Sequence, residues 1–400
     1  MRSARDGVRY MRATPAVLAV AAMTLAWMVG VTLTARDRLE STGALQQVSS
    51  QKLPMAEEAF KNIQALKGIS VDDFMQTMGI VSAALGFDCQ ECHVGAGTDQ
   101  VNWEFDTPRK RTARKMVEMV TAINRDNFGG RQVVSCWSCH RGRDRPVVTP
   151  SIDTVYGTPI LESDDIIGQA PGMPPAEQIL DKYIQASGGA QKLATFTSFT
   201  AKGSSLGFRG FGGGGEVEVY AKAPDQRATR VHYRDPERGD VNRTFDGRGG
   251  WLATPLTVLP EYALTGGELD GAKLDAQLTF PGQIKQLLTS WRVGNPVSIA
   301  KRSVMVVQWN GPWGLIGTLY FDRETGLPTR LVRYARTPIG RAPTQIDYSD
   351  YRDVEGIKIP FRWTMGWLDG LDTYQLSEVK LNAPVDPAKF GRPSASAPKR

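Results

Sequence analysis

The sequence predicts an α+β protein of several domains, with a helical part toward the N-terminus and a curved antiparallel sheet toward the C-terminus. Apolar residues recur at helical spacing before each of two Cys-x-x-Cys-His motifs. From residue 196 onward, polar and apolar residues alternate through many short stretches, as they do in strands. At 400 residues the chain exceeds the usual size of one core, so two or three globular units are expected.

The overall composition is that of a globular protein, because 41% of the residues are hydrophobic and 22% are charged, which excludes wholesale disorder. The formal net charge of +6 is mild for a chain of this length. No basic stripe interleaved with aromatic residues occurs in the sequence. We therefore expect no nucleic-acid partner.

An uncharged apolar stretch at residues 13–35 is long enough to cross a bilayer as a helix. Four arginines precede it, and by the positive-inside rule they keep the start of the chain in the cytoplasm and send the rest across. A cleaved signal peptide is the alternative, although Leu33-Thr34-Ala35 is a poor cleavage site. We expect a periplasmic protein anchored in the bacterial cytoplasmic membrane, or one released to the periplasm if the segment is cleaved.

All four cysteines lie in two five-residue motifs, at residues 89–93 and 136–140. Cys-x-x-Cys-His is the attachment signature of a c-type haem, in which both thiols bond to the porphyrin and the histidine ligates the iron. A zinc site, a redox disulfide and structural cystines are the alternatives. The pairs stand more than forty residues apart, whereas compact zinc ribbons have about 15 to 20. The predicted ligands of two covalent haem c groups are Cys89, Cys92 and His93, and Cys136, Cys139 and His140.

A helix is predicted before each motif. Ser70 is expected to cap the first helix and Gly86 to end it. The second helix is expected to start at Thr107-Pro108 and to end at Gly129-Gly130. Apolar stripes of helical period run along both helices. Their members are Phe74, Met78, Val81 and Leu85 on the first helix, and Ala113, Met116, Val120 and Ile123 on the second.

The order of helix, turn and Cys-x-x-Cys-His, with a methionine on each helix, resembles the cytochrome subunit of photosynthetic reaction centres and its relatives. The resemblance runs from about residue 54 to residue 146, and its matching residues include 78–88, 113–119, 122–124 and 141–142. That subunit typically carries four haems, and this chain has motifs for two. A photosynthetic role therefore does not follow from the residues.

The resemblance implies that Met78 and Met116 are the sixth ligands of the two irons. Met75 and Met119 lie three residues away on similar helix faces and are the alternatives. A His/Met pair fills both axial positions, leaving none open for substrate, and the thioether raises the reduction potential. We therefore expect an electron-transfer protein and not an enzyme, with redox proteins of the membrane or the periplasm as partners. The third histidine of the chain, His232, lies outside this region.

Basic residues cluster around the motifs. They can pair with haem propionates or attract an acidic redox partner, and a solvated helix face is the alternative. The cluster consists of Arg109, Lys110, Arg111, Arg114, Arg141, Arg143 and Arg145.

The C-terminal half predicts a helix at residues 176–187, a second helical pattern at residues 282–291 that could act as a lid or plug, and many strands. The stretches at residues 176–184 and 353–361 resemble the periplasmic lipoprotein-carrier half-barrel superfamily. By that resemblance a lipid or apolar ligand is expected in the concave face. The glycine run at residues 207–215 lacks the lysine of a phosphate-binding loop. Strands are predicted at 196–202, 216–222, 227–233, 241–254, 303–309, 315–322, 329–334, 357–365 and 373–381.

These predictions divide the chain into four parts. They are a signal peptide or transmembrane anchor (1–40), a dihaem cytochrome c domain (52–150), a linker (151–175) and an antiparallel half-barrel (176–393). The favoured interpretation is an exported, membrane-tethered dihaem cytochrome c that carries electrons between a membrane complex and a periplasmic partner. The alternatives are a periplasmic lipid- or ligand-binding carrier, a redox sensor with a haem domain, and a haem enzyme such as a peroxidase.

Overall fold

The computed structural model describes residues 53–393 except 99, 153–154, 156–166, 208–213, 235–238, 255–258, 288–289 and 311–315. The helical part and the sheet belong to one compact unit that starts at Pro54. The predicted membrane helix at residues 13–35 lies outside the described residues and stays a prediction. Among the helices that are described, none is both long enough and apolar enough to cross a membrane.

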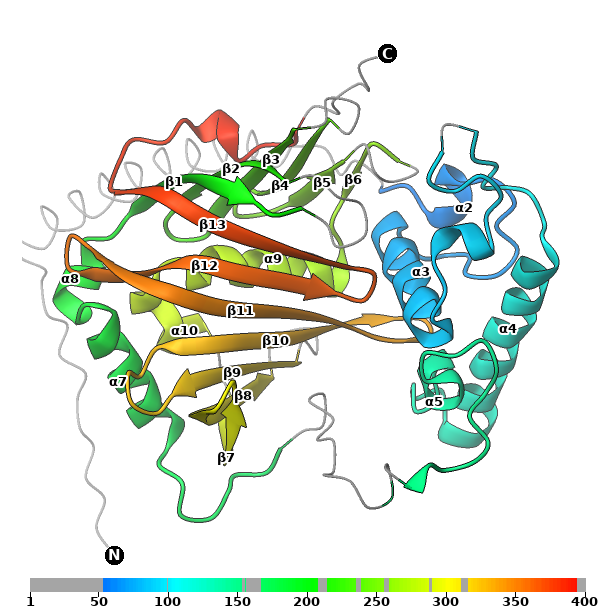
Figure 1. Ribbon diagram of the computed structural model, residues 1–400, viewed down its shortest axis with the longest axis horizontal. Coiled ribbons are helices and arrows are strands. Elements are labelled where there is room, and N and C mark those ends of the chain that lie inside the picture. Colours follow the sequence, from blue (N-terminus) through cyan, green and yellow to red (C-terminus); the bar gives the residue numbers. More distant parts are fainter. Residues whose placement is uncertain are drawn as a thin grey trace, which may run out of the picture. The chain divides into compact units, whose positions relative to one another are not determined.

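The helical part contains two long helices, and a short helical turn follows each (Figure 1). The helices predicted before the two motifs are both confirmed. The elements are α2 (Ala56–Ala59), α3 (Val71–Leu85), the 3₁₀ turn η1 (Cys89–Glu91), α4 (Pro108–Phe128) and α5 (Cys136–His140).

Side-chain caps and glycines fix the ends of both long helices. The Ser70 hydroxyl accepts a hydrogen bond from the Asp73 amide at 3.0 Å, and the Thr107 hydroxyl accepts one from the Lys110 amide at 3.1 Å. Each helix ends at a glycine in the left-handed conformation, with φ 67° at Gly86 and 61° at Gly129. The local sequence therefore determines the helix boundaries, as predicted.

A single antiparallel sheet of thirteen strands makes up most of the C-terminal part (Figure 1). Its strand order is β6-β5-β4-β3-β2-β1-β13-β12-β11-β10-β9-β8-β7, so only the β1–β13 pair joins strands distant in sequence. The strands are β1 (Ser198–Ser205), β2 (Gly215–Lys222), β3 (Gln226–Tyr233), β4 (Asp240–Phe245), β5 (Gly250–Ala253), β6 (Glu261–Ala263), β7 (Arg292–Ile299), β8 (Arg302–Asn310), β9 (Ile316–Asp322), β10 (Pro328–Thr337), β11 (Gly340–Val354), β12 (Ile357–Trp367) and β13 (Gly370–Leu381).

The sheet curves around one helix, as the predicted half-barrel requires. Helix α9 contacts β3, β4 and β5 near one edge of the sheet and also β10 toward the other edge. Helix α9 spans Gly266–Leu278. The other helical elements of this part are α7 (Ala176–Ser187), α8 (Ala190–Ala194), α10 (Ile284–Leu287) and the 3₁₀ turns η3 (Pro281–Gln283) and η5 (Pro387–Lys389).

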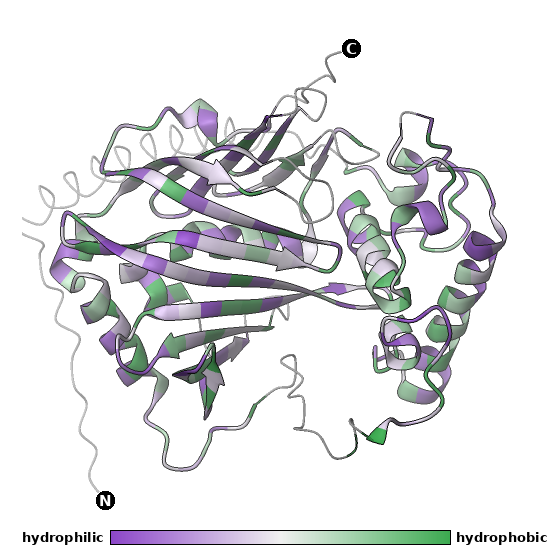
Figure 2. Cartoon of the chain, in the orientation of Figure 1, coloured by the Kyte–Doolittle hydropathy of each residue, from purple (hydrophilic) through white to green (hydrophobic). Residues whose placement is uncertain are grey.

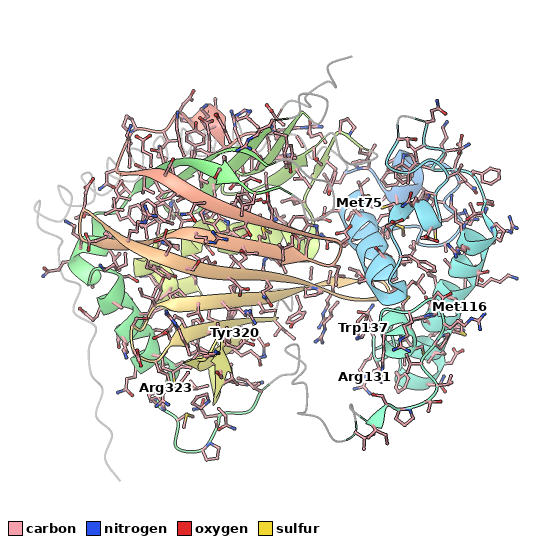
Figure 3. The ribbon with its side chains drawn as sticks, viewed as in Figure 1. Met75, Met116, Arg131, Trp137, Tyr320 and Arg323 are labelled. Atoms are coloured by element: carbon pink, nitrogen blue, oxygen red, sulfur yellow. The ribbon has the colours of Figure 1, made fainter. Side chains whose placement is uncertain are left out.

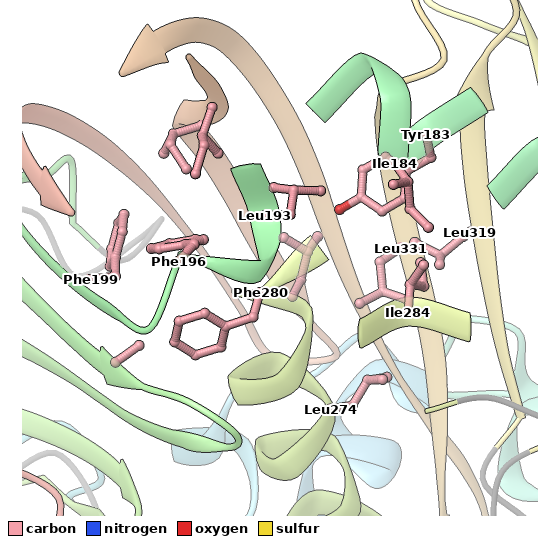
Figure 4. Close-up of a cluster of buried hydrophobic side chains, with 14 of the residues drawn as sticks. Tyr183, Ile184, Leu193, Phe196, Phe199, Leu274, Phe280, Ile284, Leu319 and Leu331 are labelled. Atoms are coloured by element: carbon pink, nitrogen blue, oxygen red, sulfur yellow. The ribbon is translucent and has the colours of Figure 1, made fainter. Parts of the chain in front are cut away.

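The main hydrophobic core fills the space between these helices and the sheet (Figure 4). Tyr183 of α7 packs on Phe321 of β9 with ring centroids 5.5 Å apart, and Phe196 packs on Phe280 at 5.0 Å. Along the strands hydrophilic and hydrophobic residues alternate (Figure 2), which places one face of the sheet on the core. The predicted alternation is therefore confirmed.

Two sequence predictions for the C-terminal part are wrong. Residues 241–254 were expected to form one strand, but the chain turns between β4 and β5, where the Asp246 carboxylate accepts hydrogen bonds from the amides of Arg248 and Gly249 at 2.8 Å each. The helix expected at residues 282–291 has other bounds, since η3 and α10 run from Pro281 to Leu287, residues 288–289 lie outside the described residues, and β7 begins at Arg292. The long helix of this region is α9, and it was not predicted.

The β10–β11 hairpin extends from the sheet to the helical part (Figure 1). Ile339 at its tip is fully buried in a small apolar cluster with Ile80 of α3 and Val117 of α4. The Gln132 side-chain amide donates a hydrogen bond to the Thr337 carbonyl at 2.5 Å. The sheet therefore supplies part of the core of the helical region, which is too small to bury α3 and α4 by itself.

Candidate functional site

The first Cys-x-x-Cys-His motif forms a tight helical turn directly after α3. The Asp88 carboxylate caps this turn by accepting a hydrogen bond from the Gln90 amide at 3.1 Å. The amides of Cys92 and His93 both bond to the Cys89 carbonyl, at 3.3 and 2.9 Å. This backbone brings the two thiols and the imidazole onto one short turn, which is the geometry that haem attachment needs.

A cavity of about 2300 Å³ lies between this turn, helices α3 and α4, and the concave face of the sheet. The first motif lines it with both thiols and with His93. Helix α3 forms another wall of the same cavity. This wall is largely apolar, which suits the apolar faces of a porphyrin ring. The α3 residues on this wall are Asp72, Phe74, Met75, Gln76, Met78, Gly79, Val81, Ser82 and Leu85, and α4 adds Lys110, Ala113, Arg114 and Val117.

His93 has the environment of a metal ligand. Its ring lies edge-on to Trp103, with the centroids 5.0 Å apart. Burial, assisted by the Lys110 charge, lowers the pKa of His93 below its usual value, which favours the neutral imidazole that binds metals. The Nδ1 atom is buried and has no hydrogen-bond partner among the described residues. A buried ring nitrogen without a partner in the protein is free to ligate a metal.

Both candidate methionines of α3 line the cavity, so its lining does not separate Met78 from Met75. Met78 lies beside Gly79, where the β12–β13 turn approaches the helix. An added Cβ at Gly79 would be 3.7 Å from Leu368 and 3.8 Å from Asp369. The sixth ligand of the first iron stays a prediction, with Met78 favoured by the resemblance.

Several of the basic residues around the first motif have partners that hold them in place. Arg114 forms an ion pair with Asp106 at 2.8 Å, and Lys110 donates to the Trp103 carbonyl at 2.7 Å. Arg109 pairs with Glu91 inside the motif. In contrast, Arg141, Arg143 and Arg145 are exposed, and the described residues offer them no ion pair within 4.0 Å.

The second motif is α5 itself, which Ser135 precedes as its N-cap residue. The Nδ1 atom of His140 lies 3.0 Å from the Arg143 carbonyl. A ring nitrogen held by a carbonyl leaves the other nitrogen for a metal. The Cys136 side chain packs against the apolar cluster that contains Ile80, while Cys139 is exposed. The residues that line the 2300 Å³ cavity do not include this motif.

The candidate methionines for the second iron lie on α4. Met116 is half-buried, and Met119 is 44% exposed. In Figure 3, Met116 lies on α4 and Trp137 on α5, and Met75 lies on α3. Trp137 is half-exposed, which allows it to cover one edge of a planar group at the surface. The exposure of Met119 supports Met116 as the ligand, and the assignment stays a prediction.

The two motifs are joined by a direct backbone contact. The Gly142 amide, two residues after His140, donates a hydrogen bond to the Ala84 carbonyl at 2.8 Å, near the end of α3. The segment packs so closely that a Cβ at Gly86 would lie 2.4 Å from the Gly142 carbonyl oxygen. The first motif begins three residues after Gly86, so the two attachment segments are neighbours in space.

The residues present fit the two predicted haem groups. All four cysteines are free thiols, and each pair has its histidine on the same turn. Within the described residues, no group of three or more His, Cys, Asp and Glu side chains lies close enough to hold a metal ion, so the two cysteine pairs form no shared cluster. His232 lies on β3, 3.0 Å from Asp240, and is not part of either site.

Sequence reasoning missed the residues that the rest of the chain adds to these sites. Trp103 follows the first motif without any periodic pattern, and Leu368 and Ile339 come from hairpins of the distant sheet. Only the tertiary fold brings them together. The tight packing of Gly142 on α3 also has no local signal beyond the Arg-Gly pair after the motif.

Comparisons with known proteins agree with the resemblance for the N-terminal part. Residues 25–154 match the family described as the photosynthetic reaction centre cytochrome C subunit. The photosynthetic reaction center cytochrome c subunit of Thermochromatium tepidum is 36% identical over 121 residues, which are 28% of this chain and 29% of that protein. The chain thus spans less than a third of the length of this curated relative.

Among solved structures, the C-terminal part is similar to half-barrel proteins. A LolA superfamily protein from Nitrosomonas europaea matches 55% of this chain and 99% of its own, with 15% identity and a TM-score of 0.38. A DUF1329 family protein from Desulfovibrio piger matches 55% of this chain and 98% of its own, with 11% identity and a TM-score of 0.38.

Proposed function

We propose, from the relationship of residues 25–154 to reaction-centre cytochrome c subunits, that this chain is a dihaem c-type cytochrome that carries electrons. The family indicates a c-type cytochrome with covalently bound haem c. The observation that supports two haems working as a pair is the hydrogen bond between Gly142 and Ala84, because it holds the two attachment segments together. In this proposal the two attachment segments would hold both haems next to each other within one domain.

Different residues of the chain would attach the porphyrin, ligate the iron and neutralise the propionates of each haem. When bound, haem c supplies an iron that gains and loses one electron reversibly. The cysteines would hold the porphyrin, and His93 and His140 would ligate the irons. Met78 and Met116 are the proposed sixth ligands. Lys110 and Arg114, which line the first cavity, offer positive charge to haem propionates.

We infer that the protein is an electron carrier and not an enzyme, because a histidine and a methionine on each iron would leave no position for a substrate. The proposed partners are redox proteins of the membrane and the periplasm. The exposed arginines after the second motif, Arg141, Arg143 and Arg145, support an acidic partner on that side. In this proposal these arginines would hold the partner beside the second motif.

The proposed location is the periplasm, with the predicted helix at residues 13–35 as a membrane anchor. Covalent haem c is attached outside the cytoplasmic membrane in bacteria, and the family match therefore supports an extracytoplasmic protein. Comparing the membrane and soluble fractions of expressing cells tests the anchor. Protein found in the soluble periplasmic fraction and cleaved after the apolar stretch would contradict it.

The first experiment measures haem directly. The protein is expressed with the haem-attachment machinery, and its haem content and near-infrared spectrum are recorded. We expect two covalent haems per chain and a methionine-to-iron charge-transfer band in the oxidised form. Met78→Ala and Met116→Ala should each remove about half of that band, and Met75→Ala and Met119→Ala are the matched controls that should keep it.

Three outcomes of this experiment would contradict the proposal in different ways. If no covalent haem is found, zinc binding or disulfide formation becomes the explanation of the cysteine pairs. High-spin haem without the methionine band would favour an enzyme or a redox sensor. Loss of the band in the control variants, with retention in Met78→Ala and Met116→Ala, would move the axial ligands to Met75 and Met119.

The size of the cavity favours a second candidate function. At about 2300 Å³ it exceeds the roughly 300 to 1,000 Å³ of ordinary ligand sites. Much of it lies inside the curved sheet, away from the first motif, and is lined there by Phe199, Leu319 and Phe321. We propose that the half-barrel also binds an apolar ligand, as a periplasmic carrier does.

A further inference from the structure

The interior of the half-barrel contains buried charges beside its apolar walls. Arg227 and Arg243 project from β3 and β4 into the cavity, and Glu268 and Asp275 face them from α9. Arg333 of β10 is fully buried behind Glu268. Charged groups in such a place are stable only when they are paired, so each one needs a partner.

Two of the three arginines have their partners within the protein. Arg243 forms an ion pair with Glu268 at 3.1 Å, and Arg333 forms ion pairs with Glu268 at 3.0 Å and with Asp275 at 3.7 Å. Burial raises the pKa of Glu268, but the Arg333 and Arg243 charges outweigh it and hold the pKa below its usual value. Glu268 is therefore an ionised partner for both.

Arg227 has no such partner. Among the described residues its side chain donates one hydrogen bond, to the Thr279 hydroxyl, and no carboxylate lies within 4.0 Å of it. Burial lowers the pKa of Arg227, and the Asp275 carboxylate, at a longer distance, raises it in opposition to burial. An arginine keeps its proton at neutral pH. The side chain lines the cavity, so Arg227 presents an unpaired positive charge to whatever the cavity holds.

A charge count around Arg227 gives the same result. Three guanidinium groups, those of Arg227, Arg243 and Arg333, face the two carboxylates of Glu268 and Asp275. The next carboxyl, Asp72, has its pKa raised by burial to about 8, so it is mostly neutral at pH 7. Among these groups the guanidiniums outnumber the ionised carboxylates by one, and a single anion beside Arg227 would balance the excess. Asp369 and Asp372 also line the cavity, and burial raises the pKa of both carboxyls.

The surroundings of Arg227 also suit a molecule with a head and a tail. Tyr348 lines the cavity and has no hydrogen-bond partner among the described residues, so its hydroxyl is available beside the arginine. Beyond these polar groups the cavity is bordered by apolar side chains that are only partly buried, among them Leu278, Trp363 and Met365. Polar groups converge at one place, and apolar surface extends from it.

We propose that the half-barrel binds an anionic amphipath, a molecule with an apolar chain and a carboxylate or phosphate head, and that Arg227 pairs with the head. This inference rests on the second candidate function and adds the chemical class of the ligand and the residue that selects it. A free fatty acid and a lysophospholipid both have this chemistry. The head would also accept a hydrogen bond from Tyr348, and the chain would lie along the apolar wall.

The test measures binding of three molecules to the delipidated holoprotein by titration calorimetry: palmitate, palmitoyl lysophosphatidate and the neutral hexadecanol. We expect wild type to bind one or both anions at least about 10-fold more tightly than hexadecanol. The tighter of the two anions identifies the source of the ligand, a fatty acid or a phospholipid. Arg227→Gln should remove this preference, and Arg227→Lys, which keeps the charge, should restore part of it.

The matched control is Arg230→Gln on the same strand. Arg227, Thr229 and Val231 line the cavity, so Arg230 points to the opposite face of β3, and its loss should leave binding unchanged. The haem spectrum of each variant is recorded to show that the protein is folded and loaded.

Two results would overturn the inference, and they are distinguishable from a failure of the second candidate function. If all three molecules bind equally in wild type and in Arg227→Gln, the half-barrel takes an apolar ligand without an anionic head. If Arg227→Gln changes the haem spectrum and leaves palmitate binding intact, the arginine serves a haem propionate. If none of the molecules binds, the second candidate function itself fails.

Discussion

At the scale of single residues, the contact between Gly86 and Gly142 is the most demanding in the helical part. Gly86 ends α3 with φ 67°, a conformation that costs an L-residue about 1 kcal/mol relative to glycine. The Gly142 carbonyl also fills the space that a Cβ would need. Gly86 therefore carries two constraints, one from its own backbone and one from the second motif.

These two constraints can be separated by a matched pair of variants. Gly129 ends α4 with φ 61° and has no atom within 4 Å of an added Cβ. We expect Gly129→Ala to lower the free energy of unfolding by about 1 kcal/mol. Gly86→Ala should cost about 1 to 2 kcal/mol more, since the second motif must also move. Chemical denaturation of both variants measures the difference, and equal losses would mean that the Gly86–Gly142 contact carries no strain.

At the scale of elements, the N-termini of α3 and α9 meet head to head. Their N-cap residues touch, with the Ser70 and Thr265 hydroxyls 2.6 Å apart. The Thr265 amide donates to the Asp72 carboxylate at 2.7 Å, and Glu268 lies in the first turn of α9. Acidic side chains at both positive helix ends are favourable, but burial raises the pKa of Asp72 to about 8.

This buried carboxyl predicts a pH dependence of stability. Its pKa is raised in the folded state from 3.8 to about 8, so between these values the folded protein binds more protons than the unfolded chain, and stability falls as the pH rises. Asp72→Asn removes the ionisation and keeps an acceptor for Thr265. We expect the free energy of unfolding of the variant to rise relative to that of wild type between pH 4 and pH 8. The rise should be on the order of a few kcal/mol in total, at about 1.4 kcal/mol per pH unit.

Guanidinium denaturation at several pH values measures this gain, with Glu118→Gln on the exposed side of α4 as the control. A constant difference between Asp72→Asn and wild type across the range would show that Asp72 is ionised in the folded protein at all of these pH values.

Elements also show why part of the fold was predictable and part was not. Helices α3 and α4 carry caps, stripes and terminal glycines, so local sequence was enough to place them. Helix α9 was missed because it contains glycines, which argue against a helix interior. Its Gly271 is there for close packing, since a Cβ would lie 2.0 Å from the Arg333 guanidinium. The same closeness builds the buried charge cluster, which no local pattern reveals.

Strand β11 was missed for a related reason. It is polar along much of its length and contains Pro343, so it lacks the apolar character of the predicted strands. Pairing with β10 and β12 decides its conformation. The covalent haem ligands were predictable because attachment chemistry fixes their spacing, whereas Trp103, Arg227 and Ile339 act through tertiary contacts alone.

At the scale of the whole molecule, the helical part and the sheet are tied at two separate places. One is the junction of α3 with α9 through Thr265, and the other is the β10–β11 hairpin, whose Ile339 is buried against α3 and α4. The cavity also has walls from both parts. Neither part can separate from the other without exposing apolar surface, so we expect the two to unfold together.

This coupling predicts a single unfolding transition with two probes. Haem absorbance reports on the helical part, and far-ultraviolet circular dichroism reports on the secondary structure of both parts. The two curves should coincide with increasing guanidinium. Ile339→Ala leaves a cavity at the hairpin tip and should lower stability by about 2 to 4 kcal/mol, moving both curves together. The control Arg336→Ala, at an exposed position of the same hairpin, should change stability by less than about 0.5 kcal/mol.

The opposite result would be two resolved transitions in wild type, with Ile339→Ala moving only the haem curve. The sheet would then be an independent domain, and the helical part would depend on it for its stability.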